Sequence, residues 1–171
     1  ALAAGSNAFE VSSTTGNLTM SGGTITVVDP IAATGNGLEV LCQTGAAAYN
    51  ITGGTLRVGD GVSATAGADG FQVSTHTVPL WNLELNGNNT AASRMVTLTN
   101  STAQRNLVVK NNLVINTGTL NANFGGNSSN LTIGGSYTNS GTLNLGTAST
   151  MTLNGTSPQA TGATFPSSVP N

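Results

Sequence analysis

Short stretches of alternating apolar and polar residues run along most of the chain. Between Leu113 and Gly155, apolar residues recur at every second position in pieces that are cut by Asn, Gly and Ser. A period of two is typical of β-strands with one buried face. The breaks lack the regular Asn-Gly dipeptides that two-residue hairpins favour. The pattern therefore predicts many short strands, and it does not favour an antiparallel meander.

A Gly-Thr phrase followed by an apolar residue recurs between these strands. Its four copies stand at Gly23-Thr24, Gly54-Thr55, Gly118-Thr119 and Gly141-Thr142. A degenerate copy is expected near Asn86-Gly87. A phrase that recurs in this way predicts a coil that passes the same corner repeatedly.

A second phrase recurs with about the same period as the first. It reads Phe9-Glu-Val, Leu38-Glu-Val and Phe71-Gln-Val, with a spacing of about 30 residues. Two independent phrases with one period indicate an internal repeat, and repeats of this length predict a solenoid in which each coil covers the next. If the phrases stack in register, Glu10 lies beside Glu39.

These observations predict an all-β fold, specifically a right-handed parallel β-helix (β-solenoid) of about five to six coils with three short strands per coil. The expected organisation is an N-terminal extension (1–8), the solenoid (9–156) and a Pro- and Ser-rich tail or linker (157–171). The residues expected in the core are apolar residues at alternate positions of the strands: Phe9, Val11, Leu18, Ile25, Val40, Ile51, Leu56, Phe71, Val73, Leu83, Leu107, Val109, Ile115, Leu120, Leu131, Ile133, Leu143, Leu145 and Leu153.

Composition narrows the possible partners. Charged residues make up 6% of the chain and the formal net charge is −2, which argues against nucleic acid or an anionic membrane as a partner. The sequence has no apolar run of about 18 residues that would span a bilayer. Abundant Val, Ile and Thr favour a folded chain over a disordered one.

Candidate catalytic residues are scarce, and we expect no cofactor and no enzymatic activity. The single histidine, His76, stands in a loop sequence without an identifiable partner. Asp60 and Asp69 share a Gly-rich loop and are weak candidates for a cation site. Cys42 alternates with Leu38 and Val40, so we expect a small buried residue; a reactive thiol and an intermolecular bridge are the alternatives. Arg94, Arg105 and Lys110 form a small basic group that we expect to be solvated.

Asparagines concentrate near the predicted corners, where the left-handed backbone conformation and side-chain amide bonding suit them. Stacked in register, they are expected to form amide ladders. The Asn-x-Ser/Thr triplets are read as part of this turn chemistry, with glycosylation as the alternative. The corner asparagines are Asn86, Asn111, Asn112, Asn116, Asn121 and Asn139, and the triplets begin at Asn17, Asn50, Asn88, Asn100, Asn127, Asn130 and Asn154.

Three segments resemble the coils of giant repeat-rich surface proteins of Gram-negative bacteria, which are often exported by type IX secretion. They begin with Leu80-Trp-Asn-Leu-Glu-Leu, Asn130-Leu-Thr-Ile-Gly-Gly and Thr150-Met-Thr-Leu-Asn-Gly. The resemblance implies a secreted or cell-surface β-solenoid that acts as a stalk, adhesin or biofilm-matrix fibre. It carries over no catalytic residue, because the shared motif is structural. The chain would then be a fragment, a processed subunit or an internal section.

Three classes of function follow from the sequence. The first is a structural fibre, whose partners are further copies stacked head to tail or neighbouring repeats of a longer chain. The second is a binding module for surface glycans or for ice; an ice-binding face needs regular rows of Thr-x-Thr, and the three copies with an apolar middle residue do not match in position. The third is a polysaccharide-degrading enzyme on a β-helix scaffold, which the shortage of ionisable residues disfavours. These three Thr-x-Thr triplets begin at Thr24, Thr97 and Thr150.

Overall fold

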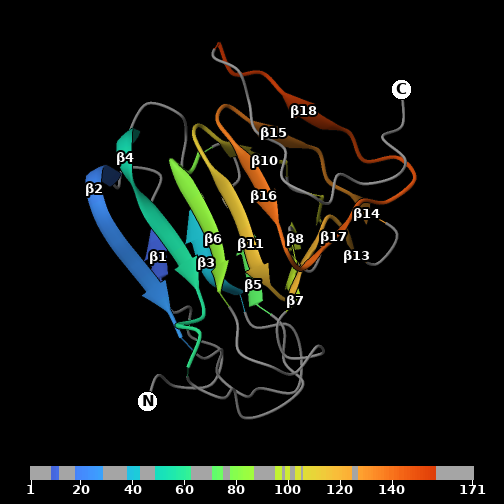
Figure 1. Cartoon of the computed structure of the whole chain (residues 1–171), viewed down its shortest axis with the longest axis horizontal. Coiled ribbons are helices and arrows are strands. Elements are labelled where there is room, and N and C mark those ends of the chain that lie inside the picture. Colours follow the sequence, from blue (N-terminus) through green and yellow to red (C-terminus); the bar gives the residue numbers. More distant parts are fainter. Residues whose placement is uncertain are drawn as a thin grey trace.

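A computed structural model describes a large part of the chain (Figure 1). The described residues are 9–11, 18–28, 38–42, 49–62, 71–74, 78–86, 95–97, 99–100, 103–104, 106–124 and 127–156. Side chains are described for 18–28, 49–62, 78–86, 106–123 and 128–156.

Every regular element in these residues is a strand, so the described part of the chain is all-β, as the alternation predicts. The strands of the first half are β1 (Phe9–Val11), β2 (Leu18–Val27), β3 (Leu38–Cys42), β4 (Tyr49–Val58), β5 (Phe71–Ser74), β6 (Asn82–Asn86), β7 (Met95–Thr97), β8 (Thr99–Asn100) and β9 (Ala103–Gln104). Those of the second half are β10 (Leu107–Val109), β11 (Leu113–Thr117), β12 (Thr119–Asn121), β13 (Asn123–Phe124), β14 (Asn127–Ser128), β15 (Leu131–Ile133), β16 (Tyr137–Asn139), β17 (Thr142–Asn144) and β18 (Met151–Leu153).

Three sheets contain most of these strands, and all pairings within them are parallel. The six-stranded sheet has the order β1-β3-β5-β7-β12-β17, and the five-stranded sheet has the order β2-β4-β6-β11-β16. The three-stranded sheet has the order β10-β15-β18. The two short pairs β8-β9 and β13-β14 are antiparallel. Strand order in each large sheet follows sequence order, so each sheet is extended at one edge as the chain proceeds.

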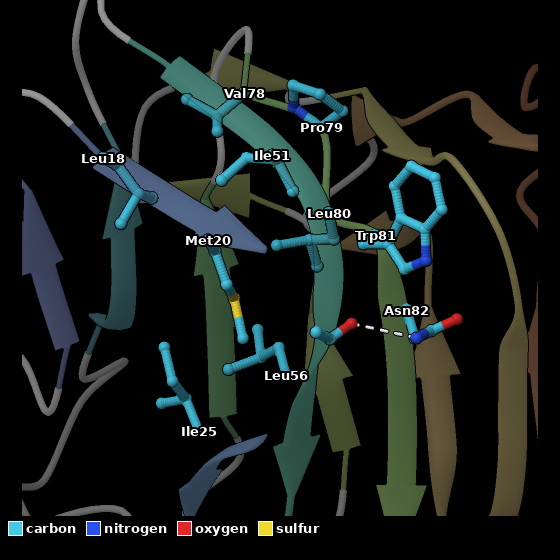
Figure 2. Close-up of a pocket in the computed structure, with 11 residues that line it drawn as sticks. Leu18, Met20, Ile25, Ile51, Leu56, Val78, Pro79, Leu80, Trp81 and Asn82 are labelled. Carbon is cyan, nitrogen blue, oxygen red and sulfur yellow. Dashed lines mark hydrogen bonds between the residues drawn. The ribbon is translucent and has the colours of Figure 1, made fainter. Parts of the chain in front are cut away.

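The chain visits the three sheets in turn in its second half. From β10 it passes to β11 and β12, and from β15 to β16 and β17, before it returns to the three-stranded sheet at β18. Leu80 extends the three-stranded sheet by a parallel bridge to Val109. Residues 18–20 of β2 pair with 49–51 of β4, and they lie beside Leu80 around a shared cavity (Figure 2). We call residues 18–20, 49–51, Leu80, β10, β15 and β18 the third side.

The register corrects one expectation about the repeated Phe-Glu-Val phrase. Phe9 pairs with Val40, two residues beyond Leu38, so Glu10 lies opposite Leu41 and not beside Glu39. A shift of two residues preserves the alternation of faces, whereas a shift of one would reverse it. The apolar pattern therefore determines which side chains face the core. The pairing of residues between neighbouring strands depends on the turns.

The strands also run through some predicted breaks. The Gly-Thr phrase was expected to stand between strands, but β2 continues through Gly23-Thr24 from Leu18 to Val27, and β4 continues through Gly54-Thr55 from Tyr49 to Val58. The register between β2 and β4 shifts near Ser21, where the chain bends. A bulge of this kind turns a strand without ending it.

The Gly-Thr phrase marks two corners and not one. Thr24 pairs with Thr55 in the five-stranded sheet, whereas Thr119 pairs with Thr142 in the six-stranded sheet. Gly23, Gly54 and Gly118 have positive φ angles of 77°, 94° and 89°, which favour glycine. The expectation that all four copies mark a single corner is therefore wrong, because the same local turn is used wherever the chain bends sharply. Asn86 pairs with Thr117, so it aligns with the second corner.

The buried apolar side chains of the described residues form one large cluster, to which all three sheets contribute, and a small cluster around Ile51 and Val78. Of the residues expected there, the buried ones are Ile51, Leu56, Leu83, Leu107, Val109, Ile115, Leu120, Leu131 and Ile133. The half-buried ones are Leu18, Ile25, Leu143, Leu145 and Leu153. The side chains of Phe9, Val11, Val40, Phe71 and Val73 lie outside the described part. The core also contains Val27, Val58, Val78, Leu85, Leu113, Ala122, Tyr137 and Met151.

Candidate functional site

Asparagine side chains connect successive strands at the corner that precedes the five-stranded sheet. Asn82 Nδ2 donates to the carbonyl oxygen of Gly54 at 2.9 Å, and Asn82 Oδ1 accepts from the backbone N–H of Asn112 at 3.1 Å. Asn112 Oδ1 in turn accepts from the N–H of Ser136 at 2.9 Å. Asn111 Nδ2 donates to the same Asn82 oxygen at 2.9 Å. We call this chain of bonds the first asparagine ladder.

A second asparagine ladder lies at the corner that precedes the three-stranded sheet. Asn106 Oδ1 accepts from the N–H of Asn130, and Asn130 Oδ1 accepts from the N–H of Thr150, both at 2.9 Å. In the six-stranded sheet, Asn144 Nδ2 donates to Asn121 Oδ1 at 2.9 Å. Backbone N–H groups at corners lack a partner in the strand ladder, and side-chain carbonyls here supply one.

The ladders confirm the sequence expectation for Asn111, Asn112 and Asn121. Sequence reasoning missed Asn82, Asn106 and Asn130. A usable signal was present, because Asn-Leu dipeptides occur at 17–18, 82–83, 106–107, 112–113, 130–131 and 144–145. In the four from 82–83 to 130–131 the leucine is buried and the asparagine stands one residue ahead of it, at the corner, whereas Leu18 and Leu145 are half-buried. A polar amide immediately before the first core residue is therefore the mark of a ladder position.

Glycines allow successive strands to approach each other at these corners. A Cβ at Gly53 would fall on the carbonyl of Ser21, and one at Gly134 would fall on the carbonyl of Lys110. At Gly141 it would lie 2.5 Å from Gly118 O and 2.8 Å from Ile115 Cγ2. These positions therefore require glycine for lack of space, and Gly141 needs no positive φ to explain it.

An ion pair lies on the outer face of the five-stranded sheet. Arg57 and Glu84 are opposite each other in register, and Arg57 Nε donates to Glu84 Oε2 at 2.9 Å. Asn116 Nδ2 donates to the other carboxylate oxygen at 3.1 Å. The side chains of Arg57 and Glu84 are 37% and 20% exposed, so the pair is partly screened by water and contributes at most about 1 kcal/mol.

Asp60 takes part in a turn. Its Oδ1 accepts from the N–H of Val62 at 2.9 Å, a local bond that aspartate commonly forms at turns. Asp69 lies outside the described residues, so the proposed pairing of the two carboxylates is not tested. Among the residues that the structure describes, no three His, Cys, Asp or Glu side chains gather as a metal site would require.

An apolar cavity lies on the third side, between residues 49–51 of β4 and Leu80 (Figure 2). Its volume is about 20 Å³, enough for a single water molecule. The side chains of Met20, Ile51 and Trp81 contribute to an apolar lining that would not hold a water by hydrogen bonds. Near it, Lys110 Nζ donates to the carbonyl of Ile51 at 3.1 Å. The cavity is thus a small apolar gap between strands.

Tyr137 is the largest fully buried side chain among the described residues. Burial raises the pKa of its hydroxyl above the ordinary value of 10.0, because the phenolate would lose its hydration. A hydrogen bond with Asn139 opposes this shift in part. The hydroxyl is therefore neutral in the folded protein at physiological pH, and it fills the core as an aromatic residue.

Several other sequence candidates fall outside what is described. His76, Arg94 and Arg105 lie outside the described residues, and Cys42 is placed only by its backbone, opposite Val11. Lys110 is exposed. Whether these three residues form a basic group therefore stays a prediction, because only Lys110 lies within the described residues.

The triplets considered for modification and for ice binding are distributed over different surfaces. Asn130 uses its side-chain oxygen in the second ladder, whereas Asn50 and Asn154 are exposed. The Thr-x-Thr triplet at Thr24 lies in the five-stranded sheet, and the one at Thr150 leads into the three-stranded sheet. These two triplets therefore do not form one row.

Searches for related proteins returned nothing that assigns a family. No family model matches the chain, no curated protein matches it, and no solved structure matches it. In the described part, no helix is long and apolar enough to cross a membrane.

Proposed function

We propose that this chain is a secreted or cell-surface structural protein, a non-enzymatic section or subunit of an extracellular fibre used in adhesion or in a biofilm matrix. Its architecture would be a parallel β-helix in which each winding contributes a strand to each of three sides. The winding would be right-handed, because crossovers between parallel strands strongly prefer that hand. The resemblance to repeat-rich bacterial surface proteins supports an extracellular location.

The observation that carries the proposal is the continuity of the ladders. The bonds from Gly54 through Asn82 and Asn112 to Ser136 pass from strand to strand in one direction. Together with the parallel pairings, these bonds connect a strand to the strand beside it in the same sheet, at equivalent positions along the two strands. Such a repeat builds a stiff rod whose length grows with the number of windings.

The polar groups of the described residues support a structural role. Arg57 and Glu84 pair with each other, Asp60 closes a turn, and Lys110 binds the carbonyl of Ile51. Each is engaged in holding strands or turns together. Catalysis needs ionisable groups that converge on a shared cleft, whereas the Arg57–Glu84 pair, Asp60 and Lys110 each take part in a separate interaction.

Negative-stain electron microscopy of the purified chain tests the proposal. Elongated rods or fibres with uniform width are expected. Leu131→Asp, which places a charge in the core, is the matched control and should abolish them. Compact particles together with specific binding on a glycan array would overturn the fibre proposal in favour of a binding module.

A further inference from the structure

The three sides end in strands that have a free edge within the described residues. At the end of the sheet orders stand β16, β17 and β18, and at the beginning stand β1 and β2 (Figure 1). All pairs in the large sheets are parallel, so both ends present strands in the same sense. A second copy in the same orientation can therefore continue the pairing.

Several apolar side chains on the end strands are less buried than those in the middle of the third side, although Met151 of β18 and Val27 of β2 are buried. On the third side, Leu107 and Leu131 are 1% and 0% exposed, whereas Leu18, Met20 and Leu153 are only half-buried. Natural proteins commonly protect sheet edges with Lys or Pro. The strands β2, β16, β17 and β18 contain no charged residue and no Pro. The remaining edge strand, β1, contains one charged residue, Glu10, so four of the five edge strands lack the usual devices against edge-to-edge pairing.

The strand order restricts how a second copy can dock. The described chain begins in the six-stranded sheet with β1 and ends on the third side with β18, so the five-stranded sheet has one strand fewer than the six-stranded sheet. If β16 paired directly with β2 of the next copy, then β1 of that copy would fall at the level of β17. The two strands would collide.

We propose that β17 pairs with β1 and β18 pairs with residues 18–20 of a second copy, which leaves the space of one strand between β16 and β2 of that copy. This inference rests on the proposed β-helix and names the partner surface and its register. Met151 then lies opposite Leu18, Thr152 opposite Thr19, and Leu153 opposite Met20. The half-buried apolar side chains of both ends become covered. The contact is heterologous, so it propagates into a filament.

Disulfide trapping tests this register. Thr19 and Thr152 are both exposed and would be neighbours across the contact, about 4.8 Å apart, which is within the range for a disulfide. In a Cys42→Ala background, the double variant Thr19→Cys/Thr152→Cys should form a reducible series of dimers and longer multimers on mild oxidation. An equimolar mixture of the two single variants should form mostly mixed dimers.

The matched control uses the five-stranded sheet. Thr26 and Thr138 are also exposed, and they occupy equivalent outward positions on β2 and β16. The proposal puts them two strand spacings apart, about 9.6 Å, which is too far for a disulfide. The variant Thr26→Cys/Thr138→Cys should therefore stay monomeric under the same oxidation.

The outcomes separate this inference from the proposed function. Cross-linking of the 26/138 pair without the 19/152 pair would overturn the register, and failure of both pairs would overturn the contact. Fibres seen by microscopy without 19/152 cross-links would overturn the contact and leave the fibre function standing. Cross-linked short oligomers without fibres would support the contact and contradict the fibre function.

Discussion

At the scale of single residues, glycine is required where two strands touch. Gly141 lies against Gly118 and Ile115, whereas a Cβ at Gly22 would meet nothing within 4 Å. Both glycines precede the Gly-Thr corner or belong to it, so sequence context alone does not distinguish them. The two glycines differ in whether a neighbouring strand lies within contact distance.

Gly141→Ala should destabilise the protein by about 1–3 kcal/mol, because the added methyl group overlaps the Gly118 carbonyl and forces the strands apart. Gly22→Ala is the control and should change the free energy of unfolding by less than about 0.5 kcal/mol. Urea denaturation followed by circular dichroism measures both. Equal effects would show that the close contact at Gly141 is absent.

The buried hydroxyl of Tyr137 makes stability depend on pH in the alkaline range. Its pKa is raised in the folded protein, so below pH 10.0 the hydroxyl is neutral in both the folded and the unfolded chain. Above that value the unfolded chain ionises first and is stabilised. Stability from this group is therefore lost as the pH rises from 10.0 through the folded pKa.

Tyr137→Phe should remove this component of the pH dependence. The variant should lose less stability than the parent between neutral pH and the alkaline range, when each is compared with its own value at pH 7. Thermal unfolding across the pH series gives the comparison. Parallel curves for the two proteins would mean that Tyr137 ionises equally in the folded and unfolded states.

At the scale of elements, a strand in the middle of a sheet is held by its neighbours on both edges. Leu131 of β15 is buried between Leu107 of β10 and Met151 of β18, while Thr132 points outward between Val108 and Thr152. One face of this short strand therefore requires apolar side chains, and the other face tolerates polar ones.

Leu131→Asp should destabilise the fold by more than about 4 kcal/mol, because it buries a charge that has no partner. Thr132→Asp, one residue along the same strand, should cost about 1 kcal/mol or less, since its side chain reaches solvent. Soluble yield and denaturant midpoints report both effects. If the two variants behaved alike, the assignment of faces in β15 would be wrong.

The first asparagine ladder should contribute measurably to the contact between β4, β6 and β11. Asn82→Ala removes bonds to Gly54, Asn111 and Asn112, and should cost about 2 kcal/mol. Asn116→Ala removes one exposed bond to Glu84 and should cost less than about 0.5 kcal/mol. Chemical denaturation distinguishes them, and a neutral Asn82→Ala would show that water replaces the ladder at no cost.

At the scale of the whole molecule, packing and hydrogen bonds outweigh charge. The chain has 4 basic and 6 acidic residues, and the Arg57–Glu84 pair is partly exposed. Screening by salt acts mainly on exposed charges. The fold should therefore depend little on ionic strength.

Raising sodium chloride from about 0.05 M to about 0.5 M should change the free energy of unfolding by less than about 0.5 kcal/mol. Differential scanning calorimetry at both concentrations checks this. A large loss of stability in salt would reveal a charged contact of greater weight than Arg57–Glu84.

Much of the local structure could be predicted from the alternation. Leu107, Leu131 and Ile133 were expected in the core and are buried, because period two directly encodes one buried face. The ladder positions Asn112 and Asn121 were also expected. Val78 and Ala122 were missed, since the first follows a loop sequence and the second is too small to stand out in an apolar pattern.

The alternation did not predict which residues of neighbouring strands are paired. It also did not predict which corner each Gly-Thr phrase occupies or where two strands come into close contact. Phe9 pairs with Val40 and not with Leu38, and the four Gly-Thr copies divide between two corners. A shift by two residues keeps every side chain on its face, so the apolar pattern is indifferent to it. Likewise, a Gly-Thr turn has the same local sequence at either corner.

The sequence by itself determined that the chain forms short strands with one apolar face, that its corners contain Gly and Asn, and that few ionisable groups are present. Only the tertiary structure decided which strands are neighbours, which asparagines join them and which glycines lack space for a side chain. The physical reason is range: alternation and turn preference act within a few residues, whereas Asn82 meets Asn112 and Gly118 meets Gly141 only after the chain has returned to the same side.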